Sequence, residues 1–90
     1  MITIGTIYTG DEERTVIARV ILDDRQTGEY LLQDNFSACG AWFRTLDDLV
    51  ESCFDFDFVQ KRCAGVRPIL HLHGHRGFGT PFTEEKTIKI

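Results

Sequence analysis

The sequence lacks the features that mark membrane-spanning, secreted and disulfide-bonded proteins. No apolar run approaches the roughly 20 residues that are needed to span a bilayer. The N-terminus, residues 1–8, has no basic stretch and already alternates like a strand, so it does not match a signal peptide. The three cysteines are odd in number and form no Cys-x-x-Cys pair, which argues against a disulfide framework and a four-cysteine zinc site. We therefore expect a soluble, cytoplasmic protein with no membrane contact.

Length and composition fit one small globular domain. The 90 residues lie near the lower end of what folds on one hydrophobic core, and we expect a single α+β domain over residues 1–90. The content of 42% hydrophobic and 27% charged residues is ordinary for a globular chain and argues against disorder. No linker, repeat or low-complexity segment divides the chain.

The chain also lacks a basic excess, and its net charge of −4 is unevenly spread. Residues 34–57 hold six acidic residues against Arg44 alone, whereas residues 58–79 hold four basic residues and no acidic one. Either these two oppositely charged segments attract each other within the fold, or the surface has one acidic face and one small basic face. Four dispersed basic residues make a poor nucleic-acid footprint, which argues against a nucleic-acid partner.

The first third of the chain predicts an antiparallel meander. Residues 2–8 and 15–22 alternate as strands, and residues 29–33 form a third short strand. The polar segments 9–13 and 23–28 between them are typical of turns, and Gly28 allows a positive φ there.

The middle of the chain changes to a helical period. Thr45 is the expected N-cap of a helix whose apolar stripe packs on the sheet. That stripe is Leu46, Leu49, Val50, Cys53 and Phe54, and we expect it to pack against Val16, Val20 and Leu70. Residues 54–58 are a break or the start of a second short helix, which Asp57 caps and Gly65 ends. Directly before Thr45, either Trp42 or Phe43 fixes the helix entry to the core, and the other is exposed.

The last third returns to strands. Residues 66–73 predict a strand with Leu70 and Leu72 on one face, which starts after Pro68 or lies at an edge because proline cannot donate to a ladder. The glycines of residues 74–81 predict a mobile loop, and residues 82–90 predict an edge strand. The expected architecture is a small antiparallel sheet in the order βββ-α(α)-ββ, packed on one or two helices.

Three histidines occupy alternate positions, His71, His73 and His75. They are the main group of side chains in the sequence that could coordinate a metal or transfer protons near neutral pH. On a strand, imidazoles two residues apart leave the same face, so His71 and His73 have a genuine two-ligand spacing for a metal. A further ligand would have to come from elsewhere, and Cys63, Asp55 and Asp57 are candidates. The alternative is a polar strand face with partly exposed histidines, which we favour.

No other segment predicts a catalytic or cofactor site. The glycine-rich residues 73–79 lack the lysine-serine ending of a phosphate loop and a helix after it. Ser37 and Cys39 have no nucleophile elbow around them, although Cys39 with His71 or His73 is conceivable in three dimensions. We therefore expect a non-enzymatic protein without a cofactor.

These properties favour a protein-binding module. Small acidic proteins of phages and mobile elements that block a host complex, anti-CRISPR proteins among them, share its composition, so a steric or charge-based inhibitor is the lead hypothesis. The candidate contact residues are Asp48, Glu51, Asp55, Trp42, Arg76 and Phe78. The alternatives are a metal-binding protein or metal-dependent enzyme built on His71 and His73, and a weak nucleic-acid binder through the basic segment 61–79. Monomer and homodimer remain open.

Overall fold

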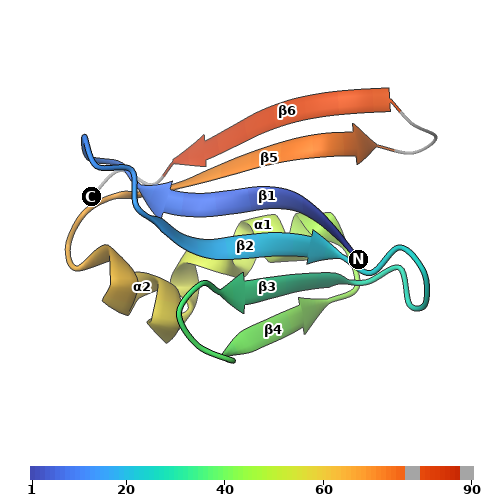
Figure 1. The fold of residues 1–90 in the computed structure, drawn as a ribbon, viewed down its shortest axis with the longest axis horizontal. Helices are drawn as coiled ribbons and strands as arrows, with labels where there is room; N and C mark the ends of the chain where they lie inside the picture. The colour runs from blue at the N-terminus through green and yellow to red at the C-terminus, as the bar shows by residue number, and fades with distance from the viewer. Residues whose placement is uncertain (77–79, 88–90) are drawn as a thin grey trace.

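The chain forms a six-stranded antiparallel sheet with two short helices on one of its faces (Figure 1). In this computed structural model the backbone is described for residues 1–76 and 80–87, and side chains for residues 1–73. The elements in chain order are β1 (Ile2–Thr9), β2 (Val16–Leu22), β3 (Tyr30–Asp34), β4 (Gly40–Phe43), α1 (Leu46–Ser52), the 3-10 helix η1 (Cys53–Asp55), α2 (Asp57–Cys63), β5 (Pro68–Arg76) and β6 (Thr80–Thr87). The strand order is β4-β3-β2-β1-β5-β6, so the predicted α+β class is confirmed.

The fourth strand of the meander was not predicted. Residues 40–43 pair antiparallel with β3, where Tyr30 lies opposite Phe43 and Leu31 opposite Trp42. The interpretation of these residues as a simple helix entry is therefore incomplete, and the order is ββββ-αα-ββ. Four residues are too few to show a strand's alternation, and β4 exists because β3 supplies its hydrogen-bonding partners.

The helical region follows the prediction except at one cap. Thr45 is the N-cap of α1, and its Oγ1 accepts a hydrogen bond from the Asp48 amide at 3.2 Å. The predicted break is the 3-10 turn η1, after which α2 begins. The predicted cap at Asp57 is wrong: this residue already lies in α2, and its N-cap Phe56 makes no side-chain capping bond. The turn after α2 takes two left-handed residues, Ala64 at φ 50° and Gly65 at φ 85°.

The C-terminal hairpin is longer than predicted. Pro68 is the first residue of β5, where a missing N–H is tolerated, and β5 lies between β1 and the edge strand β6. Residues 74–76 and 80–81, predicted as part of a mobile loop, belong to strands, with Gly74 opposite Phe82. Pairing with β6 compensates for the weak strand preference of glycine, a long-range effect that local composition does not reveal. Residues 77–79 and 88–90 lie outside the described residues.

The core lies between the sheet and the helices. Leu49 of α1 is fully buried, as are Val20 and Leu70 of the sheet, in agreement with the predicted helix packing. Val16 is an exception, since it is 36% exposed while its neighbour Ile17 is 1% exposed. The reason is a register shift between β1 and β2 near residues 7 and 8, a bulge that exchanges the residue facing the core.

Candidate functional site

The helices lie on one face of the sheet and leave the other face uncovered (Figure 1). The strand register places a row of apolar side chains on this uncovered face. Trp42 of β4 lies opposite Leu31 of β3, and Leu31 lies opposite Ile21 of β2, so the three share one face. Their chain neighbours Leu32 and Val20 are buried on the helix side, which places this apolar row on the uncovered side. The side chains of Leu31 and Ile21 are half-buried, and Trp42 is 49% exposed.

A second apolar band crosses the same face around Tyr8. This residue of β1 lies opposite Val16 of β2 and Ile69 of β5, and the Arg14 guanidinium lies 5.7 Å from the centre of its ring. The polar residues Gln33, Arg19, Thr6 and His71 lie between the two bands, each opposite the next in the register. Among the described side chains that β1–β5 place on this face, none is acidic. This composition suits contact with another macromolecule.

The β2–β3 turn beside Trp42 is built around Asp23. Its carboxylate accepts hydrogen bonds from the Gln26 amide at 3.3 Å, the Thr27 amide at 3.3 Å and the Thr27 hydroxyl at 3.0 Å. Burial by itself raises the pKa of Asp23, but these hydrogen bonds outweigh it, so the pKa lies below its ordinary value. Asp23 is therefore ionised at neutral pH.

A shallow pocket of about 390 Å³ opens between this turn and β4. We call it the Trp42 pocket; it is lined by Met1, Asp23, Gln26, Thr27, Glu29 and Trp42. An aromatic face and two carboxylates thus surround one depression. The sequence prediction found Trp42 but missed Asp23 and Glu29, because the loop brings them to β4 only when β3 and β4 pair.

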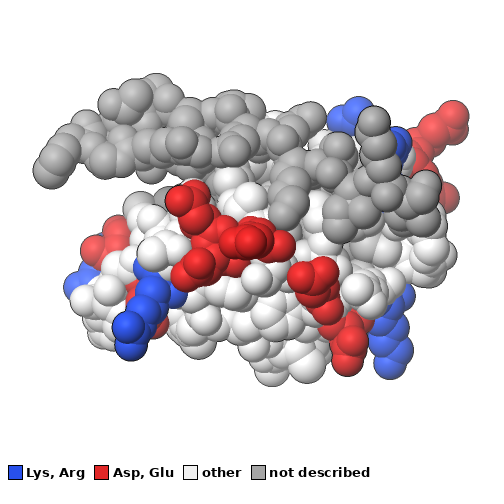
Figure 2. Space-filling model, turned by 180° about the vertical axis from the view of Figure 1, so that it is seen from behind, with Lys and Arg blue, Asp and Glu red and all other residues white. Residues whose placement is uncertain are grey.

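The predicted acidic contact residues lie on the other side of the molecule. Asp48, Glu51 and Asp55 are exposed in α1 and η1, and acidic side chains gather over this helical layer (Figure 2). The structure therefore does not bring them together with Trp42, and one flat interface cannot include both sets. Arg76 ends β5, but its side chain and the whole of Phe78 lie outside the described residues.

Two of the three histidines of β5, His71 and His73, contact each other on the uncovered face. The ring centroids of His71 and His73 are 6.0 Å apart in an edge-to-face arrangement. Among residues 1–73, whose side chains are described, no group of three His, Cys, Asp or Glu side chains could hold a metal ion. Of the candidate further ligands, Cys63 is buried in the core, where burial raises the pKa of its thiol. The side chain of His75 lies outside the described residues.

The residues considered for nucleophilic catalysis have structural partners. Ser37 Oγ donates to Asp34 Oδ2 at 2.6 Å and accepts from the Cys39 amide at 3.2 Å. Both residues shape the β3–β4 turn. Cys39 is exposed, whereas Cys53 and Cys63 are buried.

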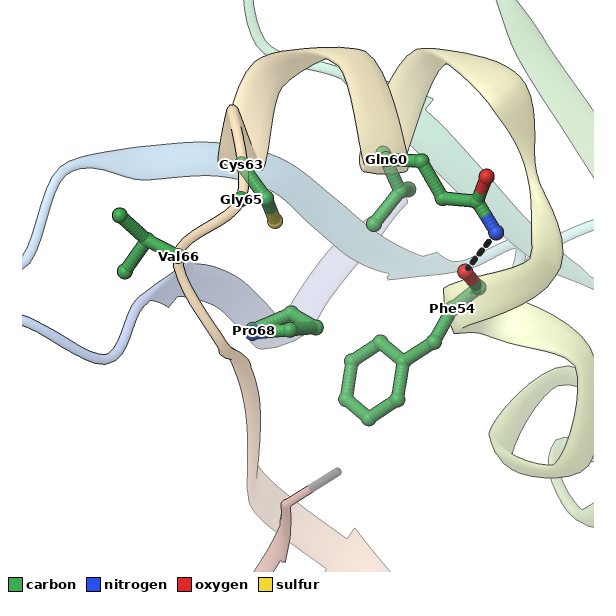
Figure 3. A pocket seen from close by; sticks show the side chains of 7 residues that line it. Phe54, Gln60, Cys63, Gly65, Val66 and Pro68 are labelled. Carbon is green, nitrogen blue, oxygen red and sulfur yellow. Dashed lines mark hydrogen bonds between the residues drawn. The ribbon is translucent and has the colours of Figure 1, made fainter. Parts of the chain in front are cut away.

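A second pocket, of about 310 Å³, lies between α2 and the start of β5 (Figure 3). It is lined by Phe54, Val59, Gln60, Cys63, Gly65, Val66 and Pro68. The Gln60 amide donates to the Phe54 carbonyl at 3.2 Å, so its N–H group is already engaged. The lining residues carry no charge and are mostly apolar.

The structure also contains an ion pair with a buried carboxylate that the sequence analysis missed. The side chain of Asp34 is 1% exposed, and Arg62 of α2 reaches it from the helical layer. One signal was present: Asp34 follows the core residue Leu32 at the spacing of two that keeps both on the same face of β3.

The described part of the chain has no helix that is long and apolar enough to cross a bilayer. The chain matches no model of a protein family, no curated protein and no solved structure.

Proposed function

We propose that this chain is a non-enzymatic protein-binding module whose partner docks on the uncovered face of the sheet. The observation that carries the proposal is the apolar row, which ends at the half-exposed Trp42 on the face without helices. Large aromatic side chains on an apolar surface are the residues that most often contribute the largest share of binding energy.

A finer version of the proposal is that the module is a small inhibitor of a host complex, of the kind that phages and mobile elements encode. Its support is compositional: a small, acidic α+β chain with a net charge of −4 resembles anti-CRISPR proteins in these gross properties. Such a module would block its target sterically, by covering a functional surface, or through charge.

The decisive variant is Trp42→Ser, with Phe36→Ser as its matched control. Phe36 is 55% exposed and lies in the β3–β4 turn, outside the apolar row. The tagged chain and both variants are produced in the native cells, and the proteins and nucleic acids that co-purify are quantified. We expect a partner protein to co-purify in equal amounts with the original chain and with Phe36→Ser. The amount that co-purifies with Trp42→Ser should be lower by about tenfold or more.

Two results would overturn the proposal. The first is a protein partner that Trp42→Ser retains at the original level. The second is retention of nucleic acid, with no protein, in a manner that depends on Trp42, which would support the nucleic-acid alternative instead.

A further inference from the structure

We infer that the Trp42 pocket binds a cationic side chain of the partner, an arginine guanidinium or a lysine ammonium group. This inference rests on the proposed function and specifies the chemistry of the partner at one point of the interface. It combines three observations: an aromatic face without a cation, two carboxylates beside it, and a rigid turn that holds them.

Among the described side chains, no cation lies over the Trp42 ring, whereas a guanidinium lies over each of two other rings. The guanidinium of Arg14 lies 5.7 Å from the centre of the Tyr8 ring, and that of Arg62 lies 4.9 Å from the centre of the Phe36 ring. Over Trp42, no cation from the described residues is in place, although it is 49% exposed and lines a pocket. Indole is the aromatic group that attracts cations most strongly.

The carboxylates of Asp23 and Glu29 give the pocket its negative charge. Asp23 is ionised because its hydrogen bonds lower its pKa, and no lysine or arginine of the described residues pairs with it. Glu29 is half-buried and lines the pocket. The pocket therefore offers a cation both an aromatic face and opposite charge.

The cationic groups that the chain itself brings close do not satisfy these carboxylates. Met1 lines the pocket, but its amino group pairs with Asp24, 3.1 Å away. Arg44 follows Trp42 by two residues, yet it forms no ion pair with Glu29. A positive charge supplied by a partner would therefore meet two carboxylates that no lysine or arginine of the described residues pairs with.

The turn that carries the carboxylates is ordered by its own backbone bonds. The Gly28 amide donates to the Asp23 carbonyl at 2.8 Å, and the Asp23 amide donates to the Glu29 carbonyl at 2.9 Å. Gly28 has φ +68°, a conformation that a side chain would strain, and this closes the turn. The entropic cost of ordering this turn when a ligand binds is therefore small.

The test uses Trp42 as its own reporter, because it is the only tryptophan of the chain. The full chain is titrated with short acetylated and amidated peptides, Gly-Arg-Gly and Gly-Lys-Gly, while the indole N–H resonance and the tryptophan fluorescence are recorded. The matched control peptide contains citrulline, which has the shape of arginine without its charge. We expect saturable changes with the arginine or lysine peptide, at least about threefold tighter than with the citrulline peptide.

Glu29→Gln removes charge from the pocket without removing the backbone bonds of the turn, and Glu12→Gln changes an exposed carboxyl group elsewhere. We expect Glu29→Gln to weaken binding of the cationic peptide by about threefold or more, and Glu12→Gln to leave its affinity unchanged. Equal binding of citrulline and arginine peptides, or no response of Trp42 to either cation, would overturn the inference. A natural partner that is lost in Trp42→Ser but binds Glu29→Gln unchanged would also overturn it, while the proposed function would stand.

Discussion

The guanidinium of Arg62 in α2 donates from Nη2 to Oδ2 of Asp34 at the end of β3, over 3.1 Å. The carboxylate is 1% exposed and the arginine side chain 38% exposed, so the pair passes from the protein surface into the interface of helix and sheet. Ser37 adds a second donor to the same oxygen, at 2.6 Å. The strand β3, the β3–β4 turn and α2 thus meet at the buried carboxylate of Asp34, which links the sheet to the helical layer.

We expect Arg62→Ala to lower the free energy of unfolding by about 1–3 kcal/mol, because it leaves a buried carboxylate short of a charged donor. The partial exposure of Arg62 keeps the effect below that of a fully buried pair. Urea denaturation measures the change, and Lys61→Ala, at an exposed position of the same helix, is the control. Equal stability of the two variants would show that the pair contributes nothing.

The stability of the chain should fall when the pH drops below the ordinary carboxyl value of 3.8. Burial by itself raises the pKa of Asp34. The hydrogen bonds from Arg62 and Ser37 and the charge of Arg62 lower this pKa by more than burial raises it, so the folded value lies below 3.8. A carboxyl group with a lowered pKa stabilises the fold above its unfolded pKa and loses that effect as the pH falls through the folded one.

Asp34→Asn tests this directly. We expect its melting temperature to depend less on pH in the acidic range than that of the original chain, with a remaining slope from Asp11 and Asp23, whose pKa values are also lowered. For Asp11 the leading cause is the hydrogen bond from the Thr9 hydroxyl. An identical pH profile in Asp34→Asn and in the control Glu12→Gln would refute the assignment.

The parts of the fold that the sequence predicts are those with a local cause. Thr45 caps α1 through a bond three residues away, and the stripe containing Leu49 and Cys53 follows the helical period. The parts that were missed depend on pairing across the chain. The bulge that exposes Val16 depends on how β2 pairs with β1, and β4 depends on its pairing with β3. The seven residues of β2 and the four residues of β4 do not show by themselves which strand will pair with them.

The same distinction applies to the candidate site. The sequence predicts that one of the two successive aromatics Trp42 and Phe43 is exposed, and the structure confirms this: Trp42 is 49% exposed, whereas Phe43 is partly buried against the core. The neighbours of Trp42 in the pocket could not be identified, since Asp23 and Glu29 reach it only through the turn between β2 and β3. The sequence analysis named Trp42 and the acidic helix residues as candidate contact residues together, although they lie on opposite faces of the molecule.

Leu49→Ala should lower the free energy of unfolding by about 2–5 kcal/mol, because Leu49 is fully buried between α1 and the sheet. A loss of this size is a large part of the roughly 5–15 kcal/mol that stabilises a small domain. Thermal melting measures it, with the exposed Glu51→Ala in the same helix as control. An unchanged melting temperature in Leu49→Ala would contradict the core packing described above.

Zinc provides a test of the histidine pair on β5. We expect the purified chain to carry no stoichiometric zinc and a chelator to leave its melting temperature unchanged, since His71 and His73 offer only two of the ligands that a structural site requires. Elemental analysis and melting curves with and without chelator measure both properties. One equivalent of zinc that disappears in His71→Ala or His73→Ala would instead support the metal-binding alternative.

Reversing Asp48, Glu51 and Asp55 to lysine should slow association with the protein partner while the fold stays intact. The three side chains are exposed on the helical layer, away from the apolar row, so they act on the partner at a distance. If the partner supplies a cation to the Trp42 pocket, an acidic molecule attracts it, and the reversal removes that attraction. Stopped-flow or surface binding kinetics should show a lower association rate with weaker salt dependence and an unchanged dissociation rate. A slower association that comes with faster dissociation would place these residues inside the interface, and wild-type kinetics would remove the helical layer from the binding mechanism.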